Sequence, residues 1–228
     1  PNLTDILTYH VLGASVASTG ITNGDIVNPV SSTNTLKLTV SGAGDVYVNQ
    51  AQVVAADISA DNGMVHVLDK IVLPVETVVD VAIDNGFSTL TTAVITAELL
   101  PALTDPLSSY TVFAPTNDAF SDLASALNTD INGLLALSNL ADILTYHVIG
   151  MEVASSSISN GAIVEPLSST NSLKLSLTES GDAYLNQAQI TAVDIASDNG
   201  LVHVLDQVVL PVETVVDVAI DNGFTTLT

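Results

Sequence analysis

Residues 110–120 read YTVFAPTNDAF and predict a buried strand that leads directly into a helix. The aromatic and β-branched residues before position 114 are typical of a strand. Pro115 should end that strand because proline has no N–H to donate to a ladder. Thr116 is a suitable helix N-cap, and Asp118 places negative charge in the first turn, where the helix dipole favours it. The helix should then bury one face made of Phe120, Leu123, Ala124 and Leu127.

The composition predicts a folded chain. It has 228 residues, of which 47% are hydrophobic, and a mean hydropathy of +0.50. This is enough for one or two domains with a hydrophobic core, and it argues against disorder. No apolar run reaches the roughly 18 residues needed to cross a bilayer, so we expect no direct membrane insertion. Cysteine is absent, which argues against thiol catalysis and thiolate metal sites.

The net charge of −22 arises because bases are missing, not because acids are in excess. The chain has 25 acidic residues, no arginine, and only three lysines, Lys37, Lys70 and Lys174. Nucleic acid is therefore excluded as a partner, since little is available to neutralise phosphates. Attraction to anionic lipid is excluded on the same ground.

An internal repeat with an offset of 137 residues organises the chain. Residues 1–91 align with residues 138–228 without a gap, and 63 of the 91 pairs are identical. The strand-to-helix corner at 110–120 occurs only once, so the repeats are out of phase with the ends of the sequence. Two explanations stay open: the sequence is a window from a longer tandem array, which we favour, or neighbouring chains complete the partial units.

The phase of the repeat predicts three parts. Residues 1–74 would be the C-terminal part of one domain, residues 75–211 a complete domain, and residues 212–228 the start of a third. The joints would lie at Leu73-Pro74-Val75 and Leu210-Pro211-Val212, where proline restricts the backbone.

Within one repeat, a helical half precedes a β half. Thr77 should cap a helix that Asn85-Gly86 closes, and a second helix should start at Ser88 and end before Pro101. Hydrophobic residues alternate with polar ones from Leu173 onward, which is typical of half-buried strands. The last strand should run from Leu201 to Leu210. The expected fold class is α+β, with helices packed on a β wedge.

Three segments resemble the signatures of the fasciclin (FAS1) domain family. They are TVFAPTNDAF at 111–120, LTYHVI at 144–149 and VHVLDQVVLP at 202–211, in that order within one period. The resemblance covers the whole chain, because residues 1–74 and 212–228 carry the corresponding parts. It implies a wedge of β-strands with packed helices, an extracellular adhesion or matrix role, and no enzymatic chemistry.

The four histidines occupy two repeated positions, His10 with His147 and His66 with His203. One interpretation is a metal pair or a catalytic base. The other, which we favour, is a buried imidazole whose nitrogens bond to backbone or to a carboxylate, because the sequence has neither an HxH nor an HExxH motif. By resemblance to the family, receptor adhesion could fall on the Tyr-His pairs Tyr9, His10, Tyr146 and His147.

Two Asp-Ile pairs stand where the family has a dipeptide associated with integrin binding. By that resemblance, binding could involve Asp57, Ile58, Asp194 and Ile195. The alternative is that each Asp is structural, near the strand end before an Asp-Asn-Gly turn. Asp-Asn-Gly recurs at 61–63, 84–86, 198–200 and 221–223, but no EF-hand loop accompanies it, so turns are favoured over calcium.

We expect no cofactor, no metal and no enzymatic activity, because no set of acid, base and nucleophile can be identified. The first hypothesis is a structural or adhesive extracellular protein whose equivalent joints propagate a fibre or cell-surface stalk, so its main partner is itself. The alternative is a module that binds surface polysaccharide or a cell-surface receptor. That function would need exposed aromatic side chains, for which Tyr47 and Tyr184 are candidates.

Overall fold

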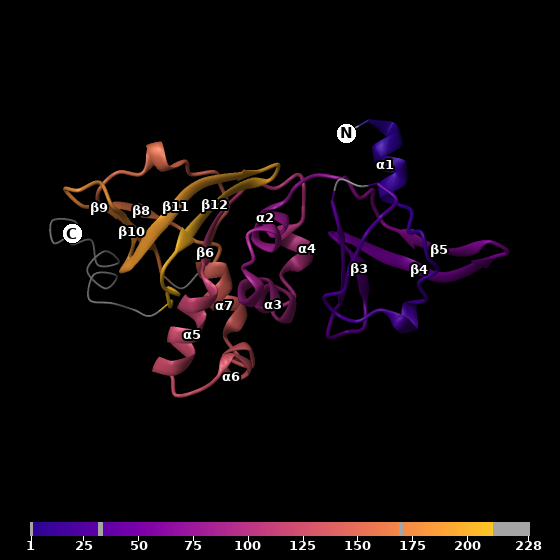
Figure 1. Cartoon of the computed structure of the whole chain (residues 1–228), viewed down its shortest axis with the longest axis horizontal. Coiled ribbons are helices and arrows are strands. Elements are labelled where there is room, and N and C mark those ends of the chain that lie inside the picture. Colours follow the sequence, from indigo (N-terminus) through magenta and orange to yellow (C-terminus); the bar gives the residue numbers. More distant parts are fainter. Residues whose placement is uncertain (1, 32–33, 169–170, 212–228) are drawn as a thin grey trace.

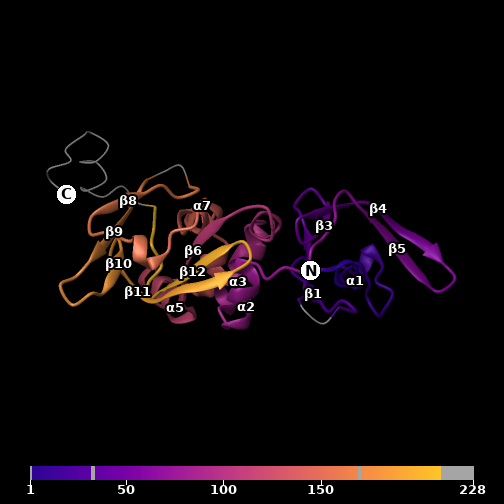
Figure 2. The same cartoon turned by 90° about the horizontal axis from the view of Figure 1, so that it is seen from above.

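The computed structural model describes residues 2–31, 34–168 and 171–211, and the structural statements below concern these residues. Two bodies lie side by side along the longest axis (Figure 1), and the view turned by 90° agrees (Figure 2). We call residues 2–74 the N-terminal segment and residues 75–211 the central segment. The start of a third domain predicted at 212–228 lies outside the described residues.

The N-terminal segment is one helix followed by a five-stranded antiparallel sheet of order β1-β2-β3-β4-β5. Its elements are α1 (Leu3–Tyr9), the 3-10 turn η1 (Ser18–Gly20), β1 (Ile26–Val27), β2 (Leu36–Val40), β3 (Val46–Val48), β4 (Ala51–Ala60) and β5 (Gly63–Leu68).

The central segment begins with helices and ends with strands, as the repeat predicts. Its helices are α2 (Val78–Asp84), α3 (Ser88–Thr96), α4 (Leu100–Leu103), α5 (Asn117–Ala126), α6 (Ile131–Leu135), α7 (Leu140–Tyr146) and the 3-10 turn η2 (Ser155–Ser157). Its strands are β6 (Tyr110–Pro115), β7 (Val148–Ile149), β8 (Ala162–Val164), β9 (Leu173–Leu177), β10 (Ala183–Leu185), β11 (Ala188–Ser197) and β12 (Gly200–Leu205).

The sheet of the central segment has the order β7-β6-β12-β11-β10-β9-β8. All neighbours are antiparallel except β12 and β6, which run parallel from Gly200 beside Tyr110 to Leu205 beside Pro115. The strand of the strand-to-helix corner, β6, therefore lies inside the sheet, between β7 and β12. The parallel pair is possible because more than 80 residues, including α5 to α7, connect the two strands.

The sheet separates two hydrophobic cores, because alternate residues of a strand face opposite sides. Val112 and Ala114 of β6 pack with the helices in a helix-side core, whereas Phe113 packs in a strand-side core with residues of β9 to β11. The fold class is therefore α+β with helices on a β wedge, as expected.

The corner itself follows the sequence closely. Thr116 is the N-cap of α5, and its Oγ1 accepts a hydrogen bond of 3.2 Å from the Ala119 N–H. Phe120 and Ala124 are buried. Leu127 was expected on the same buried face, but this prediction is wrong: the residue is the C-cap of α5, past the last regular turn, and it is exposed.

Two further boundaries differ from the expectation. Pro101 does not merely follow a helix but lies in the first turn of the short helix α4, where its missing N–H costs no hydrogen bond. The last strand ends at Leu205, not Leu210. After that point the chain leaves the ladder, and Val209 instead donates its N–H to a histidine of α7's C-terminus, His147.

The turn between β11 and β12 forms hydrogen bonds with the first residues of the central segment. The Asp198 N–H donates to the Glu76 carbonyl over 2.6 Å, and the Glu76 N–H donates to Asp198 Oδ2 over 2.8 Å. Asn199 is buried, and its Oδ1 accepts from the Val78 N–H over 2.8 Å. The Asp-Asn-Gly turn is therefore also a cap for α2, which satisfies one of the helix's free N–H groups.

Candidate functional site

The Tyr-His pair of the central segment lies at the end of α7 and is buried. Tyr146 donates its hydroxyl proton to the Ser172 carbonyl over 3.0 Å and accepts a hydrogen bond of 3.3 Å from Asn186 Nδ2. His147 contacts the Ile143 carbonyl through Nδ1 over 2.7 Å. Both side chains thus bond to the protein interior.

The bonds of His147 define its chemical form. Nε2 accepts the Val209 N–H over 2.9 Å, so the proton resides on Nδ1 and the ring is neutral. Burial lowers the pKa of His147 to about 4, and the bond to the Ile143 carbonyl only partly opposes this. A neutral ring with both nitrogens engaged can neither bind a metal nor act as a base.

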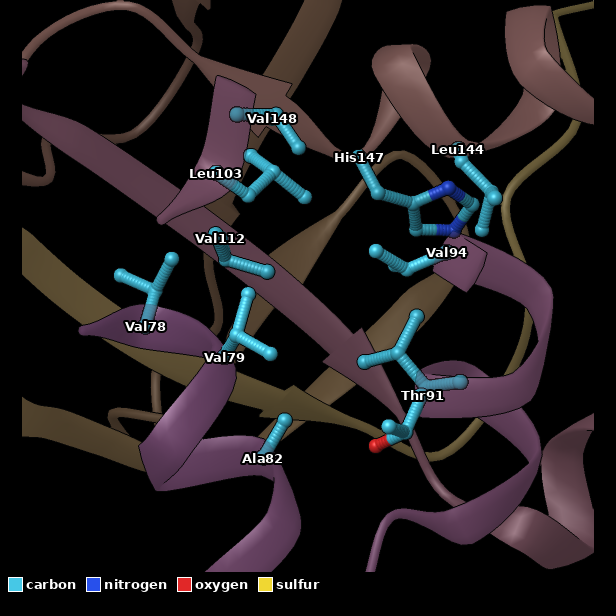
Figure 3. A pocket seen from close by; sticks show the side chains of 11 residues that line it. Val78, Val79, Ala82, Thr91, Val94, Leu103, Val112, Leu144, His147 and Val148 are labelled. Atoms are coloured by element: carbon cyan, nitrogen blue, oxygen red, sulfur yellow. The ribbon is translucent and has the colours of Figure 1, made fainter. Parts of the chain in front are cut away.

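The ring of His147 lines a cavity of about 30 Å³ between α2, α3, α4, β6 and α7. Figure 3 shows the imidazole beside Val94 and Leu144, with Val79 and Val112 further along the cavity. The volume is close to that of a single water, and the lining is almost entirely apolar. This cavity is a packing defect of the helix-side core and not a ligand site.

The second histidine position belongs to a different network. His203 is buried in β12 with its ring centroid 5.3 Å from that of Phe113. Its Nε2 contacts the Val153 carbonyl over 2.9 Å, and its Nδ1 accepts the Asp194 N–H over 3.1 Å. His203 and His147 lie in separate surroundings, and the described residues contain no group of three or more His, Cys, Asp or Glu that could hold a metal.

The Asp-Ile pair of the central segment lies at a β-bulge of β11. Asp194 has φ 58°, a left-handed conformation that Asp tolerates better than most residues. Its exposed carboxylate accepts from the Ser155 hydroxyl and, over 2.8 Å, from the Ser155 N–H. These two bonds, the hydroxyl first, hold the pKa of Asp194 below its ordinary value. Ile195 is partly buried against the helix-side core.

The N-terminal segment repeats these contacts, but most of the residues that make them are more exposed to solvent. Tyr9 is buried, and burial raises its pKa to about 12, whereas His10, Asp57 and Ile58 are exposed. Asp57 accepts from the Ser18 N–H over 2.8 Å and has the same φ of 58° as its counterpart. The structure therefore places seven of the eight candidate side chains in structural contacts; the exception is Ile58, which is exposed. Their role in binding stays a prediction.

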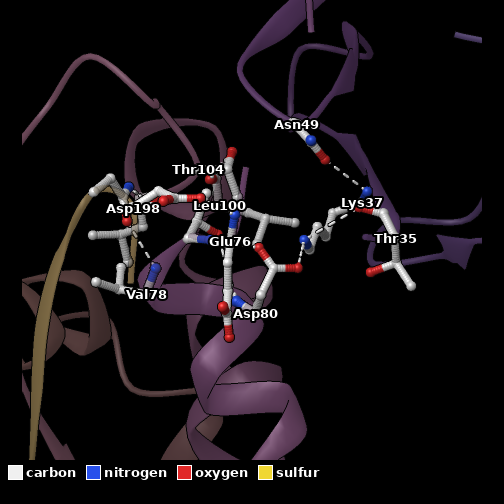
Figure 4. A network of polar contacts seen from close by, with 12 residues as sticks. Thr35, Lys37, Asn49, Glu76, Val78, Asp80, Leu100, Thr104 and Asp198 are labelled. Atoms are coloured by element: carbon white, nitrogen blue, oxygen red, sulfur yellow. Dashed lines mark hydrogen bonds and ion pairs between the residues drawn. The ribbon is translucent and has the colours of Figure 1, made fainter. Parts of the chain in front are cut away.

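A polar junction that the sequence did not predict joins the two segments (Figure 4). Lys37 of β2 extends to the first turn of α2 and forms an ion pair with Asp80 Oδ1, and both side chains are buried. The other oxygen, Oδ2, accepts the Thr77 N–H over 2.9 Å and the Thr77 hydroxyl over 2.6 Å, which completes a capping box. Burial lowers the pKa of Lys37, and Asp80 opposes that shift.

Close packing accompanies the ion pair. The Gly42 N–H donates to Glu98 Oε1 over 2.6 Å. Gly24, at φ +89°, lies against Ile95, and a Cβ on this glycine would lie 2.7 Å from Ile95 Cγ2. Thr39 is buried on the same strand as Lys37, with its Oγ1 unpartnered. The one available signal in the sequence was that Lys37 and Lys174 are repeat counterparts in a chain with three lysines.

Comparison with known proteins identifies similar sequences. The Fasciclin domain profile matches residues 1–74 and 85–211. Human periostin is 29% identical over 216 residues, which cover 92% of this chain and 25% of periostin. Protein sll1483 of Synechocystis sp. is 37% identical over 139 residues, covering 59% of this chain and 73% of that protein. The chain thus spans a quarter of the length of periostin.

A solved structure of a FAS1 domain pair from the insect cell adhesion molecule Fasciclin I is also similar. It has a TM-score of 0.51 and 20% sequence identity, and the match covers 90% of this chain and 79% of that chain. At this identity the likeness concerns the fold. In the described part of the chain, no helix combines the length and apolar character needed to cross a membrane.

Proposed function

This chain belongs to the fasciclin family of extracellular adhesion domains, and from that premise we propose that it is a non-enzymatic structural and adhesive protein. In this proposal, tandem fasciclin units form a fibre or a cell-surface stalk. The match of the family profile to both residues 1–74 and residues 85–211 supports repeated fasciclin units.

The observation that carries the proposal is the junction between the two segments. A flexible tether would leave the facing surfaces solvated, whereas here Lys37, Asp80 and Thr39 are buried between the segments. A buried ion pair tolerates little displacement, since separating the charges leaves each one desolvated without a partner. The tether itself is short and holds Pro74, with a 2.9 Å hydrogen bond from the Val75 N–H to the Leu73 carbonyl. Such a joint would set a fixed angle between successive units.

The proposal includes a division of the chain into units. We propose that residues 1–74 are the C-terminal part of one fasciclin domain, residues 75–211 a complete domain, and residues 212–228 the start of a third. Support comes from the separate sheets at 26–68 and 110–205 and from the repeat, which aligns residues 1–91 with 138–228.

Small-angle X-ray scattering of the 228-residue chain tests the fixed joint. We expect a distance distribution of one elongated particle, unchanged between low and moderate salt because the ion pair is buried. The Lys37→Met/Glu98→Ala variant removes the Lys37–Asp80 ion pair and the Gly42–Glu98 hydrogen bond across the junction, and it should broaden the distribution. If the unmodified chain is already as broad as this variant, the joint is flexible and the stalk is excluded.

The second candidate is a module that binds surface polysaccharide or a cell-surface receptor. Exposure of Asp57, Ile58 and Asp194, and the half-buried position of Tyr184 on the outer face of the sheet, favour it. Tyr146 and His147 would have to leave the core to touch a partner. Glycan-array binding that Tyr184→Ala abolishes, with the fold intact by circular dichroism, would support this function over the stalk.

A further inference from the structure

The outer face of β9 in the central segment repeats the face of β2 that forms the junction. We call the side chains of Lys174, Ser176 and Tyr184 the Lys174 face: Tyr184 pairs with Ser176 across the sheet, and Lys174 lies two residues along the same strand. In the N-terminal segment the corresponding residues are Lys37, Thr39 and Tyr47, with Tyr47 paired to Thr39.

The backbone supports of the two lysines agree closely. The Lys37 N–H donates to Asn49 Oδ1 over 2.8 Å, and the Lys174 N–H donates to Asn186 Oδ1 over the same 2.8 Å. Another repeated bond joins a glycine N–H to the carbonyl one residue after each lysine, at 2.9 Å in both copies. These glycines, Gly24 and Gly161, have φ values of +89° and +82°.

The two faces differ in what covers them. Lys37 and Thr39 are buried, since β2 contacts α4 of the following segment and Lys37 pairs with Asp80 of α2, whereas Lys174 and Ser176 are only half-buried. Within the described residues, no acidic group lies within ion-pair distance of Lys174. The Lys174 face thus repeats the N-terminal side of the Lys37–Asp80 junction, and no described residue takes the place that Asp80 has in that junction.

We propose that the Lys174 face is the docking site for residues 212–228 of the same chain, with Asp217 as the partner of Lys174. This inference rests on the proposed function, because it makes the joint between successive units repeat. Asp217 is the sequence counterpart of Asp80, and Thr214 is that of Thr77.

Sequence and charge select this occupant. Residues 212–228 differ from residues 75–91 only where Thr225 replaces Ser88, and the tether before them repeats as Leu210-Pro211-Val212. A second copy of the chain is a poorer occupant, because its own Asp80 is already engaged by Lys37. The chain has a net charge of −22, and the positive charge of Lys174 favours an acidic partner. The short tether Leu210-Pro211-Val212 supplies such a partner at high effective concentration.

Amine acetylation measured by mass spectrometry tests the proposal, because the three lysines can be followed one by one. With an N-hydroxysuccinimide ester of acetic acid, exposed Lys70 should react fastest and buried Lys37 slowest. Lys174 should be protected in the unmodified chain, and Asp217→Asn should raise its rate by about tenfold or more. The matched control Asp80→Asn should do the same for Lys37 and leave Lys174 unchanged.

Two outcomes would overturn the inference. In the first, Lys174 is acetylated at the rate expected of a half-buried lysine, and Asp217→Asn does not change that rate. This result would mean that residues 212–228 do not dock on the Lys174 face. Alternatively, protection of Lys174 could disappear on dilution, which would assign the face to another molecule. Either result leaves the scattering test of the Lys37–Asp80 joint untouched, so failure here is distinguishable from failure of the stalk.

Discussion

The N-terminal segment and residues 138–211 of the central segment are repeats of one sequence, but their environments differ. Leu7 is 59% exposed, whereas its counterpart Leu144 is 3% exposed; Val65 is 51% exposed, whereas Val202 is fully buried. In the central segment, helices α2 to α6 and strand β6 cover these positions, and the described part of the N-terminal segment has no equivalent cover. The same residue therefore contributes very different amounts of hydrophobic stabilisation in the two copies.

Local hydrogen bonds do not share this difference. His10 and His147 both contact a carbonyl one turn earlier through Nδ1 at 2.7 Å. The hydroxyls of Tyr9 and Tyr146 donate to carbonyls at 2.8 Å and 3.0 Å. Short-range polar geometry is thus set by the repeat sequence itself, whereas burial depends on which elements pack against it.

The largest contrast should come from truncating the paired leucines. Leu144→Ala should lower the free energy of unfolding by about 2–5 kcal/mol, since it adds a void beside the existing cavity. Leu7→Ala removes an exposed side chain and should cost about 0.5 kcal/mol or less. Urea titration followed by circular dichroism measures both. Equal losses would mean that the N-terminal segment is covered in solution.

Acid should distinguish the central segment next. The folded pKa of His147, about 4, lies below the value of 6.5 expected in the unfolded chain, so only the unfolded state takes up a proton between these values. Stability is therefore fully present above pH 6.5 and falls by about 3 kcal/mol as the pH drops to 4. Loss of the Asp194 bonds follows only below its ordinary pKa of 3.8, because that pKa is lowered.

The variant His147→Gln tests this assignment. A glutamine amide can donate to the Ile143 carbonyl and accept the Val209 N–H without titrating. Urea unfolding measured from pH 7.5 to 4.5 should show a flatter dependence in this variant. As a matched substitution, His10→Gln at the exposed copy should change the free energy of unfolding at pH 7.5 less than His147→Gln does. A pH slope that survives in His147→Gln would assign the effect to another group.

The smallest expected contrast concerns two glycines. Gly200 has φ +147°, and a Cβ there would lie 2.0 Å from the Tyr110 carbonyl oxygen in the parallel strand. Gly200→Ala should therefore cost about 1–3 kcal/mol through strain and displacement of β6 from β12. At Gly63, the counterpart, a Cβ would meet nothing within 4 Å. Thermal melts should show a clear shift for Gly200→Ala and little for Gly63→Ala.

Much of the architecture was predictable because it depends on short-range patterns. Thr77 and Thr116 cap helices as their spacing indicated, and Leu173 and Leu175 alternate into the core. The expectation for Leu127 was wrong because the helical spacing of hydrophobic residues continues in the sequence beyond the point where α5 ends. Strand β12 stops at Leu205 since the hydrophobic run after it packs as irregular chain, which a pattern of alternation cannot reveal.

The Lys37–Asp80 junction could not be predicted from the sequence, for a different reason. Lys37 and Asp80 are 43 residues apart and belong to different bodies, so no local period links them. The candidate Tyr-His and Asp-Ile residues could be selected by resemblance. The bonds of Asp194 to Ser155 and of His147 to Val209 could not, because each joins residues that are far apart in the sequence.

The turn between β11 and β12 determines how the central segment would bear tension. A pull on the polypeptide enters at Glu76, and the hydrogen bonds of Asp198 and Asn199 transfer it to the start of β12. Strand β12 then carries it toward Pro211. The helices between these points lie outside the load path. Stretching would therefore have to shear the turn from the first residues of α2 before any helix unravels.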